Sequence, residues 1–119
     1  MKYQNQIVDE LDSILDQRWR VVALLASKKP ISISTNQPNK THPISNKDNP
    51  YKRLHAEVSC IRKAPKSKLK NSVLYVWRFG RDGQYKIAIP CDICMPFIIE
   101  SGIRKIVYST PEGYEEMRL

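Results

Sequence analysis

The sequence contains no apolar stretch long enough to cross a membrane. Its longest uninterrupted apolar run, residues 21–26, is far shorter than the roughly 20 residues that a membrane-spanning helix needs. The N-terminus is polar and lacks the apolar core of a signal peptide. We therefore expect no membrane partner and no secretion, and we expect a cytoplasmic protein.

Cysteine is scarce, and its pattern argues against one class of fold. The chain has three cysteines, and two of them form a C-x-x-C pair at Cys91 and Cys94. An odd number of cysteines argues against a disulfide scaffold and for a reducing compartment. The pair is therefore expected to serve metal binding or redox chemistry. The redox alternative is the thioredoxin-like one, in which a C-x-x-C lies between a strand and a helix.

Acidic residues are outnumbered by basic ones, and the imbalance is confined to one segment. The 119 residues carry 20 Lys and Arg against 12 Asp and Glu, a net charge of +8. Residues 40–70 contain nine of the bases and two of the acids, a net charge of +7. Such a segment favours a polyanionic or phosphorylated partner, and the alternative is a solvated surface that keeps the protein soluble. The length supports one domain, over residues 1–119.

Apolar periodicity and turn-forming residues divide the chain into alternating helices and strands. Helices are expected over residues 7–15, from Leu54 to about Pro65, and from Pro90 to Gly102, with a long loop over residues 37–53. Strands are expected over residues 19–27, 31–34, 72–77, 85–89, 103–110 and 114–119. Strands that alternate with helices predict an α/β fold, a three-layer α/β/α sandwich whose sheet is covered on both faces.

Two short motifs begin consecutive predicted helices and are typical of metal chemistry. The first is His55-Ala56-Glu57, and the second is Pro90-Cys91-Asp92-Ile93-Cys94. Zinc binds imidazole and thiolate groups and prefers four ligands. The side chains of His55, Cys91 and Cys94 therefore leave one position for water, which is the catalytic arrangement. Bound zinc lowers the pKa of that water toward about 7, and Glu57 is close enough in sequence to take its proton.

The remaining Cys and His are poorly placed to be a fourth ligand. Cys60 lies five residues after His55, which is about 140° around a helix. We expect Cys60 to be a small buried apolar residue instead. His42 falls in the predicted loop.

The two motifs together resemble the H-x-E…P-C-x-x-C signature of zinc-dependent nucleobase deaminases. From Arg20 to Thr110 the chain resembles the cytidine deaminase superfamily, and residues 40–43 and 101–108 are similar to small phage members and to deoxycytidylate deaminases. The resemblance implies a mixed sheet of about five strands between helices. It implies one catalytic Zn²⁺ held by His55, Cys91 and Cys94. It also implies a homo-oligomer and, for a phage-encoded member, a location in the host cytoplasm.

The resemblance also implies the reaction, a zinc-dependent hydrolytic deamination of cytosine to uracil in a nucleoside or nucleotide such as dCMP. Water attacks C4 of the ring, Glu57 carries protons to N3 and to the leaving amine, and ammonia departs. Asn36 matches the position that holds the sugar, although an ordinary turn residue at a strand end is the alternative. Ala56 matches the position that places a backbone N–H near the base. The candidates for holding the phosphate are Lys40, Lys52 and Arg53.

A polynucleotide substrate is the alternative to a free nucleotide. A cytosine deaminase that acts on single-stranded DNA or RNA needs a basic groove with stacking aromatic rings. The superfamily places loops around the pocket in the regions of Trp19, Tyr51, Tyr108 and Tyr114, and Tyr108 is the one that we expect to contact substrate. A third hypothesis is a non-catalytic, nucleic-acid-binding relative with a structural zinc, and the presence of Glu57 argues against it. Because the +7 segment includes the loop before the first motif, we expect its charge to lie beside the pocket.

Overall fold

Two long antiparallel strands form the centre of the sheet. The computed structural model describes residues 3–11, 20–35, 56–80, 84–92 and 94–119. Strand β1 (Arg20–Ala26) pairs with β3 (Val73–Phe79) along its whole length, from Arg20 opposite Phe79 to Ala26 opposite Val73. Both strands are buried over most of their length. Strands covered on both faces have nearly continuous apolar sequences, which explains the run at residues 21–26.

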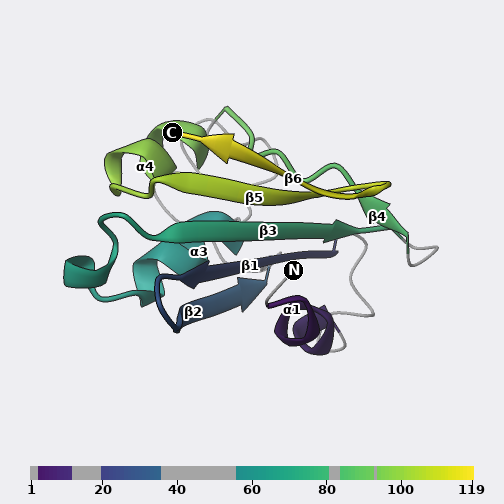
Figure 1. The fold of residues 1–119 in the computed structure, drawn as a ribbon, viewed down its shortest axis with the longest axis horizontal. Helices are drawn as coiled ribbons and strands as arrows, with labels where there is room; N and C mark the ends of the chain where they lie inside the picture. Colours follow the sequence, from purple (N-terminus) through teal and green to yellow (C-terminus); the bar gives the residue numbers. More distant parts are fainter. Residues whose placement is uncertain (1–2, 12–19, 36–55, 81–83, 93) are drawn as a thin grey trace.

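Other strands extend this pair into a mixed sheet. Strand β2 (Pro30–Thr35) is antiparallel to β1, β5 (Lys105–Thr110) is parallel to β3, and β6 (Gly113–Arg118) is antiparallel to β5. The order is β2-β1-β3-β5-β6, and the two-residue β4 (Tyr85–Lys86) pairs with the end of β3 as a sixth strand (Figure 1). The parallel pair requires a crossover connection, and helix α4 (Cys94–Glu100) lies in it.

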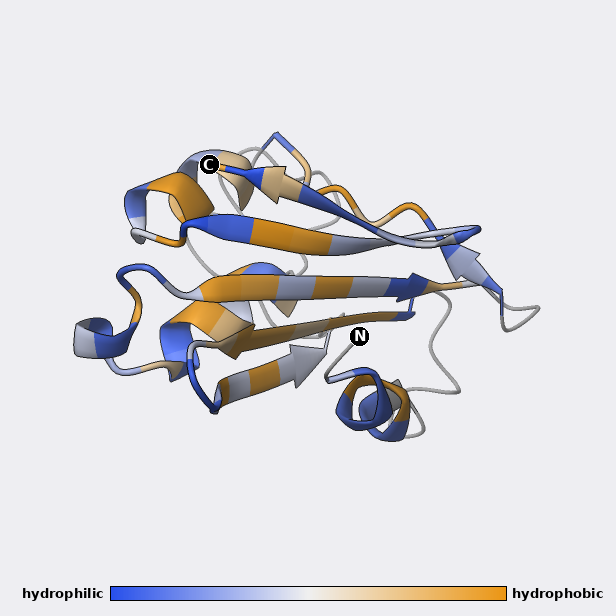
Figure 2. Cartoon of the chain, in the orientation of Figure 1, coloured by the Kyte–Doolittle hydropathy of each residue, from blue (hydrophilic) through white to orange (hydrophobic). Residues whose placement is uncertain are grey.

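The helices cover the two faces of the sheet unequally. Helices α3 (Ala56–Lys63) and α4 lie on one face, and α1 (Gln4–Leu11) lies on the other (Figure 1). Alternating strand residues supply one apolar cluster to each face, seen as orange segments along the strands in Figure 2. The cluster under α3 and α4 includes Leu25, Leu74, Val76 and Ile106. The cluster under α1 includes Val22, Leu24, Trp77 and Val107. These three layers confirm the expected α/β/α class.

Gly102 ends the crossover helix as expected. Its φ of +87° is a backbone conformation that side chains disfavour, and its N–H bonds the Ile99 carbonyl oxygen at 3.2 Å. A Cβ added there would lie 3.3 Å from the Cα of Lys70, so the close approach also requires glycine. Pro96 is the third residue of α4, where its missing N–H costs no helical hydrogen bond.

The strand expected over residues 85–89 is much shorter in the structure. Ladder pairing with β3 ends at Lys86, although side chains still alternate, with Ile87 and Ile89 exposed and Ala88 buried. The segment turns toward β5 instead, where the Ala88 N–H bonds the Ser109 carbonyl at 3.1 Å. Alternating burial therefore indicated an extended segment and not a paired strand.

Helix α4 begins later than the helix expected from Pro90, because residues 90–92 are not helical. The remaining elements agree with expectation to within a few residues where they are described. Helix α3 ends at Lys63, shortly before Pro65, and a short 3₁₀ helix, η2 (Lys66–Lys68), follows it. The predicted loop at residues 37–53, the predicted helix start at Leu54 and the second half of the first predicted helix lie outside the described residues. Among the described residues, no helix is long and apolar enough to cross a membrane.

Candidate active site

The first turns of α3 and α4 come together on the same face of the sheet. The two helices pack against each other, and α3 also packs on β1 and β2. Hydroxyl groups fix α3 on β2, because Ser34 Oγ donates to Ser59 Oγ at 2.6 Å and Ser32 Oγ donates to the Cys60 carbonyl at 2.7 Å. These bonds set the position of α3 along β2, and therefore of Glu57 in its first turn.

Glu57 is a buried carboxyl group, with 6% of its surface exposed. Its negative charge raises the pKa of the thiols of both Cys94 and Cys60, so its field reaches both sulfur atoms. A buried carboxylate is costly unless hydrogen bonds, a helix N-terminus or a cation compensate its charge. The first turn of α3 supplies part of that compensation, and a metal ion beside the Cys94 sulfur would supply more.

Cys91 and Cys94 form a compact pair of thiols at the start of α4. The N–H groups of Cys94 and Met95 bond the Cys91 carbonyl at 3.1 and 3.0 Å, which closes the turn. The two Sγ atoms lie 3.6 Å apart, with Cys94 buried and Cys91 exposed. In a tetrahedral zinc site with Zn–S bonds of about 2.3 Å, two sulfur ligands lie about 3.8 Å apart. The observed spacing fits two corners of such a site.

The surroundings of Cys94 oppose a thiolate in the absence of a cation. The hydrogen bond with the Cys91 thiol, burial, and the charge of Glu57 all raise the pKa of Cys94 far above its ordinary value. A divalent cation would reverse this balance, since zinc binds the deprotonated thiolate. The donor set therefore fits a soft, doubly charged metal ion better than a free thiol pair.

The third predicted ligand, His55, lies outside the described residues. Within the ranges that the structure describes, no group of three or more His, Cys, Asp and Glu side chains is placed to hold a metal ion. His55 directly precedes Ala56, the buried first residue of α3, which belongs to the same apolar cluster as Cys94. The proposed ligand roles of all three residues stay predictions.

Cys60 is buried as expected, and it is more polar in its contacts than a purely apolar residue. Its thiol lies 3.2 Å from Ser32 Oγ and 3.4 Å from the Ser32 carbonyl oxygen. Burial raises its pKa to about 11 in spite of these contacts. The serines of β2 and Ser59 were missed as positioning residues. The apolar alternation of β2 indicated a strand, and no sequence signal showed that its serines would face α3.

The aromatic candidates separate onto different faces of the sheet. Tyr108 lies on the α3 and α4 face, where its hydroxyl donates to Glu115 Oε2 at 3.0 Å, and this bond raises its pKa. Tyr114 lies 6.1 Å from the Trp77 ring on the opposite face, so it is not beside Glu57 and Cys94. The other predicted binding residues lie outside the described residues: Trp19, Asn36, Lys40, Tyr51, Lys52 and Arg53.

The described part of the basic segment does not lie beside the site. Helix α3 is eight residues long, about 12 Å, and Glu57 is in its first turn. Arg62 and Lys63 are in its last turn, and the lysines of η2 follow beyond it. Residues 62–70 of the +7 segment therefore lie beyond the far end of α3 from Glu57, and for residues 40–55, which lie outside the described residues, a position beside the pocket stays a prediction.

A sheet between helical layers, with a C-x-x-C turn at the start of α4 and a buried carboxyl in the first turn of α3, is the architecture of the cytidine deaminase-like fold class. The family model described as the cytidine and deoxycytidylate deaminase zinc-binding region matches residues 3–110. The chain belongs to this family.

Solved structures support the fold. The dCMP deaminase of the cyanophage S-TIM5, in its apo form, superposes with a TM-score of 0.58 at 20% identity, covering 92% of this chain and 83% of that one. The cytidine deaminase of Mycobacterium leprae superposes with a TM-score of 0.52 at 19% identity, covering 92% of each chain. No curated protein sequence matched the chain significantly.

Proposed function

We propose that the protein is a zinc-dependent hydrolase that converts cytosine to uracil in a nucleoside or nucleotide, with a dCMP-like substrate. The observation that carries the proposal is the pair of Sγ atoms 3.6 Å apart at the start of α4, within the field of buried Glu57. The membership of the chain in a family of zinc-binding deaminases supports the same metal and reaction class.

In the proposed site, His55, Cys91 and Cys94 hold one zinc ion. When bound, zinc supplies Lewis acidity that makes water a nucleophile near neutral pH. Glu57 is the proton carrier: its carboxylate takes a proton from the attacking water and delivers it to N3 of the ring. It then transfers the second proton to the amino group at C4, so that cytosine and water become uracil and ammonia. Burial of Glu57 keeps bulk water from competing for these protons.

The substrate contacts stay predictions. We infer that Asn36 binds the sugar, that the Ala56 N–H faces the base and that Tyr108 lines the pocket. Lys40, Lys52 and Arg53 are the candidates for the phosphate. A homo-oligomer and a cytoplasmic location also belong to this proposal.

A substrate panel tests the proposal. Zinc-loaded protein is incubated separately with dCMP, cytidine, deoxycytidine and a single-stranded oligonucleotide that contains cytosine, and uracil formation is measured by chromatography. We expect turnover of at least one of the three small substrates, with dCMP preferred. No turnover of any substrate by protein that contains zinc would overturn the proposed activity and favour a non-catalytic role.

Deamination of cytosine within single-stranded DNA or RNA is the second candidate function. It is favoured by the net charge of +7 over residues 40–70, which suits a polyanionic substrate. Turnover of the oligonucleotide alone would establish this candidate and exclude a free nucleotide as substrate.

A further inference from the structure

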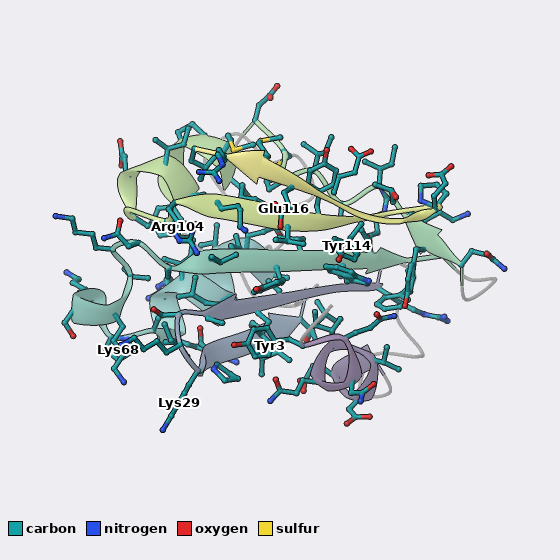
Figure 3. All side chains as sticks on the ribbon, viewed as in Figure 1. Tyr3, Lys29, Lys68, Arg104, Tyr114 and Glu116 are labelled. Carbon is teal, nitrogen blue, oxygen red and sulfur yellow. The ribbon has the colours of Figure 1, made fainter. Side chains whose placement is uncertain are left out.

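Five exposed lysines lie at the end of the sheet away from the predicted metal site. We call this surface the basic end, and it consists of Lys28, Lys29, Lys66, Lys68 and Lys70. The first two lie in the turn between β1 and β2, and the others lie on η2 and in the turn before β3. Figure 3 labels Lys29 and Lys68, which both extend outward from this end of the molecule.

The strand register brings these two segments to one edge of the sheet. Ala26, the last residue of β1, pairs with Val73, the first residue of β3. The turn that follows β1 and the turn that precedes β3 therefore leave the sheet at the same end. The parallel start of β5 lies beside them, because the Arg104 N–H bonds the Ser72 carbonyl at 2.9 Å and its Nε bonds the Asn71 carbonyl at 3.2 Å.

Acidic residues are almost absent around the basic end. In the described ranges 20–35 and 56–80, Glu57 is the only acid, and it is buried at the other end of α3. On the neighbouring elements, Glu116 is paired with Lys105 at 3.2 Å, and Glu100 is the last residue of α4. None of the five lysines has an ion-pair partner among the residues that the structure describes.

The backbone that carries these lysines is held by hydrogen bonds. In η2, the N–H groups of Lys68 and Leu69 bond the carbonyls of Pro65 and Lys66, and the Ser72 hydroxyl donates to the Leu69 carbonyl. The Asn71 N–H bonds the Gly102 carbonyl at 2.9 Å and ties the turn to the end of α4. Lysines on a fixed backbone bind a partner with a smaller loss of conformational entropy than lysines on a flexible tail do.

The chemistry of the basic end fits a phosphate backbone and not bases. Among the described residues, Tyr114 is the exposed aromatic one, and it pairs with Ser109 near the other end of β5. Sequence-tolerant binding through bases requires exposed aromatic rings on which the bases stack. Lysines without nearby rings contact phosphates, and such contacts position a nucleic acid without reading its sequence.

We propose that the basic end is a second binding surface, which holds the phosphate backbone of a polynucleotide at the end of the sheet where α3 and α4 end, away from Glu57 and Cys94 in their first turns. This inference goes beyond the proposed function and does not depend on it, because backbone binding requires neither zinc nor cytosine. The surface holds the polymer by many weak contacts, so binding is strongly salt-dependent and indifferent to base sequence.

The test measures binding of a fluorescently labelled 20-nucleotide thymidine homopolymer by anisotropy, at salt concentrations from 50 to 300 mM. The probe contains no cytosine, so turnover cannot affect the result. We expect Lys66→Gln/Lys68→Gln to reduce the slope of log affinity against log salt by about 1.4, since each lost phosphate contact on a single strand removes about 0.7. The same relation predicts an affinity about 25-fold weaker at 0.1 M salt.

Two controls separate a site from bulk charge. Lys66→Arg/Lys68→Arg keeps the charge and is expected to bind like the wild type. Two single variants form a matched pair. Lys68→Gln removes one positive charge from the basic end, and Lys86→Gln, the control, removes one exposed positive charge near the other end of β3. An equal loss of affinity for these two single variants would overturn the proposal. So would an unchanged salt slope in the double variant, or binding to phosphatidylserine vesicles without binding to the oligonucleotide.

Deamination of dCMP by the same variants keeps this proposal distinct from the proposed function. If the proposed activity is wrong, wild type and Lys66→Gln/Lys68→Gln both fail to convert dCMP while their oligonucleotide affinities still differ. If the basic end is wrong, both convert dCMP equally and bind the oligonucleotide equally.

Discussion

The two ends of helix α3 hold ionisable groups in opposite ways. At its first turn, Glu57 is a buried carboxyl group, and the nearby Cys94 at the start of α4 is a buried thiol within an apolar cluster; both groups become negative when they lose a proton. At its last turn and beyond, Arg62, Lys63 and the lysines of η2 are positive, and all are exposed. Both arrangements agree with the helix dipole, which favours negative charge at its start and positive charge at its end.

The two ends of α3 differ in how strongly their ionisable groups interact with a bound partner of opposite charge. A buried carboxyl and buried thiol act on each other through a low dielectric, so one cation between them has a large effect. Exposed lysines are screened by salt, and each contributes little alone. We therefore expect the end of α3 that holds Glu57 to bind one metal ion tightly. We expect the basic end to bind a polynucleotide through several weak contacts. The four predictions that follow test this contrast, from the largest expected effect to the smallest.

Removing either thiol of the C-x-x-C pair is expected to have the largest effect. Cys91→Ala and Cys94→Ala remove a ligand of the proposed site, so zinc content measured by atomic absorption falls toward zero and deamination is lost with it. Cys60→Ala is the matched control, since Cys60 is the third cysteine and is directed toward Ser32. Full zinc content in both C-x-x-C variants would contradict the proposed ligand set.

Replacement of Glu57 is expected to separate metal binding from chemistry. Glu57→Gln keeps the size and polarity of the side chain and removes its proton-carrying capacity. We expect zinc to be retained and kcat to fall by about 10²- to 10⁴-fold, the usual contribution of a general acid–base group. Glu112→Gln, at an exposed turn residue, is the control and is expected to leave kcat unchanged. An active Glu57→Gln enzyme would exclude the proposed proton carrier.

Cys60, between the two ends of α3, is expected to react slowly with alkylating reagents. Burial raises its pKa to about 11 from 9.0, so its thiolate fraction at pH 8 is about 100-fold below that of an ordinary thiol. As pH rises, the Cys60 thiol ionises at a lower pH in the unfolded chain than in the folded protein. Cys60 therefore contributes to the free energy of unfolding below pH 9, and this contribution is lost between pH 9 and 11. Mass spectrometry of alkylated Cys91→Ala/Cys94→Ala protein measures the rate. Fast labelling at pH 8 would show that α3 opens readily.

The smallest expected effect concerns the anchoring of α3 on β2. Ser34→Ala removes the 2.6 Å bond to Ser59 and leaves that buried hydroxyl without its partner. We expect a loss of about 1–3 kcal/mol in the free energy of unfolding, measured by urea denaturation. The double variant Ser34→Ala/Ser59→Ala should lose less than the sum of the single losses, because both polar groups are then gone. Strict additivity would indicate that the pair does not position α3.

Most of the fold could be predicted from local sequence signals. The apolar run at residues 21–26, the β-branched and aromatic residues at 73–79 and the glycine at 102 each act over a few neighbouring residues. The strand expected beyond Lys86 failed because side-chain alternation reports which face is buried and not whether the backbone is paired. Register, strand order and the parallel pairing of β3 with β5 depend on contacts between distant segments.

The candidate site was also indicated by sequence, through the spacing of two motifs at helix starts. Spacing alone could not show that Glu57 is buried within range of Cys94, nor that Tyr114 lies on the other face. It also could not place the serines of β2 against α3. These facts depend on how helices pack on strands that are far away along the chain.

The sequence by itself determined the chemistry of this protein: which side chains can bind a metal, carry a proton or attract a phosphate, and how its charge is distributed along the chain. Only the tertiary structure decided where that charge lies. Because α3 carries the chain away from Glu57, the basic residues of the range 62–70 lie at the far end of that helix and not beside the buried carboxyl. A side chain keeps its charge wherever it lies, but its distance from the site is set by the helix between them.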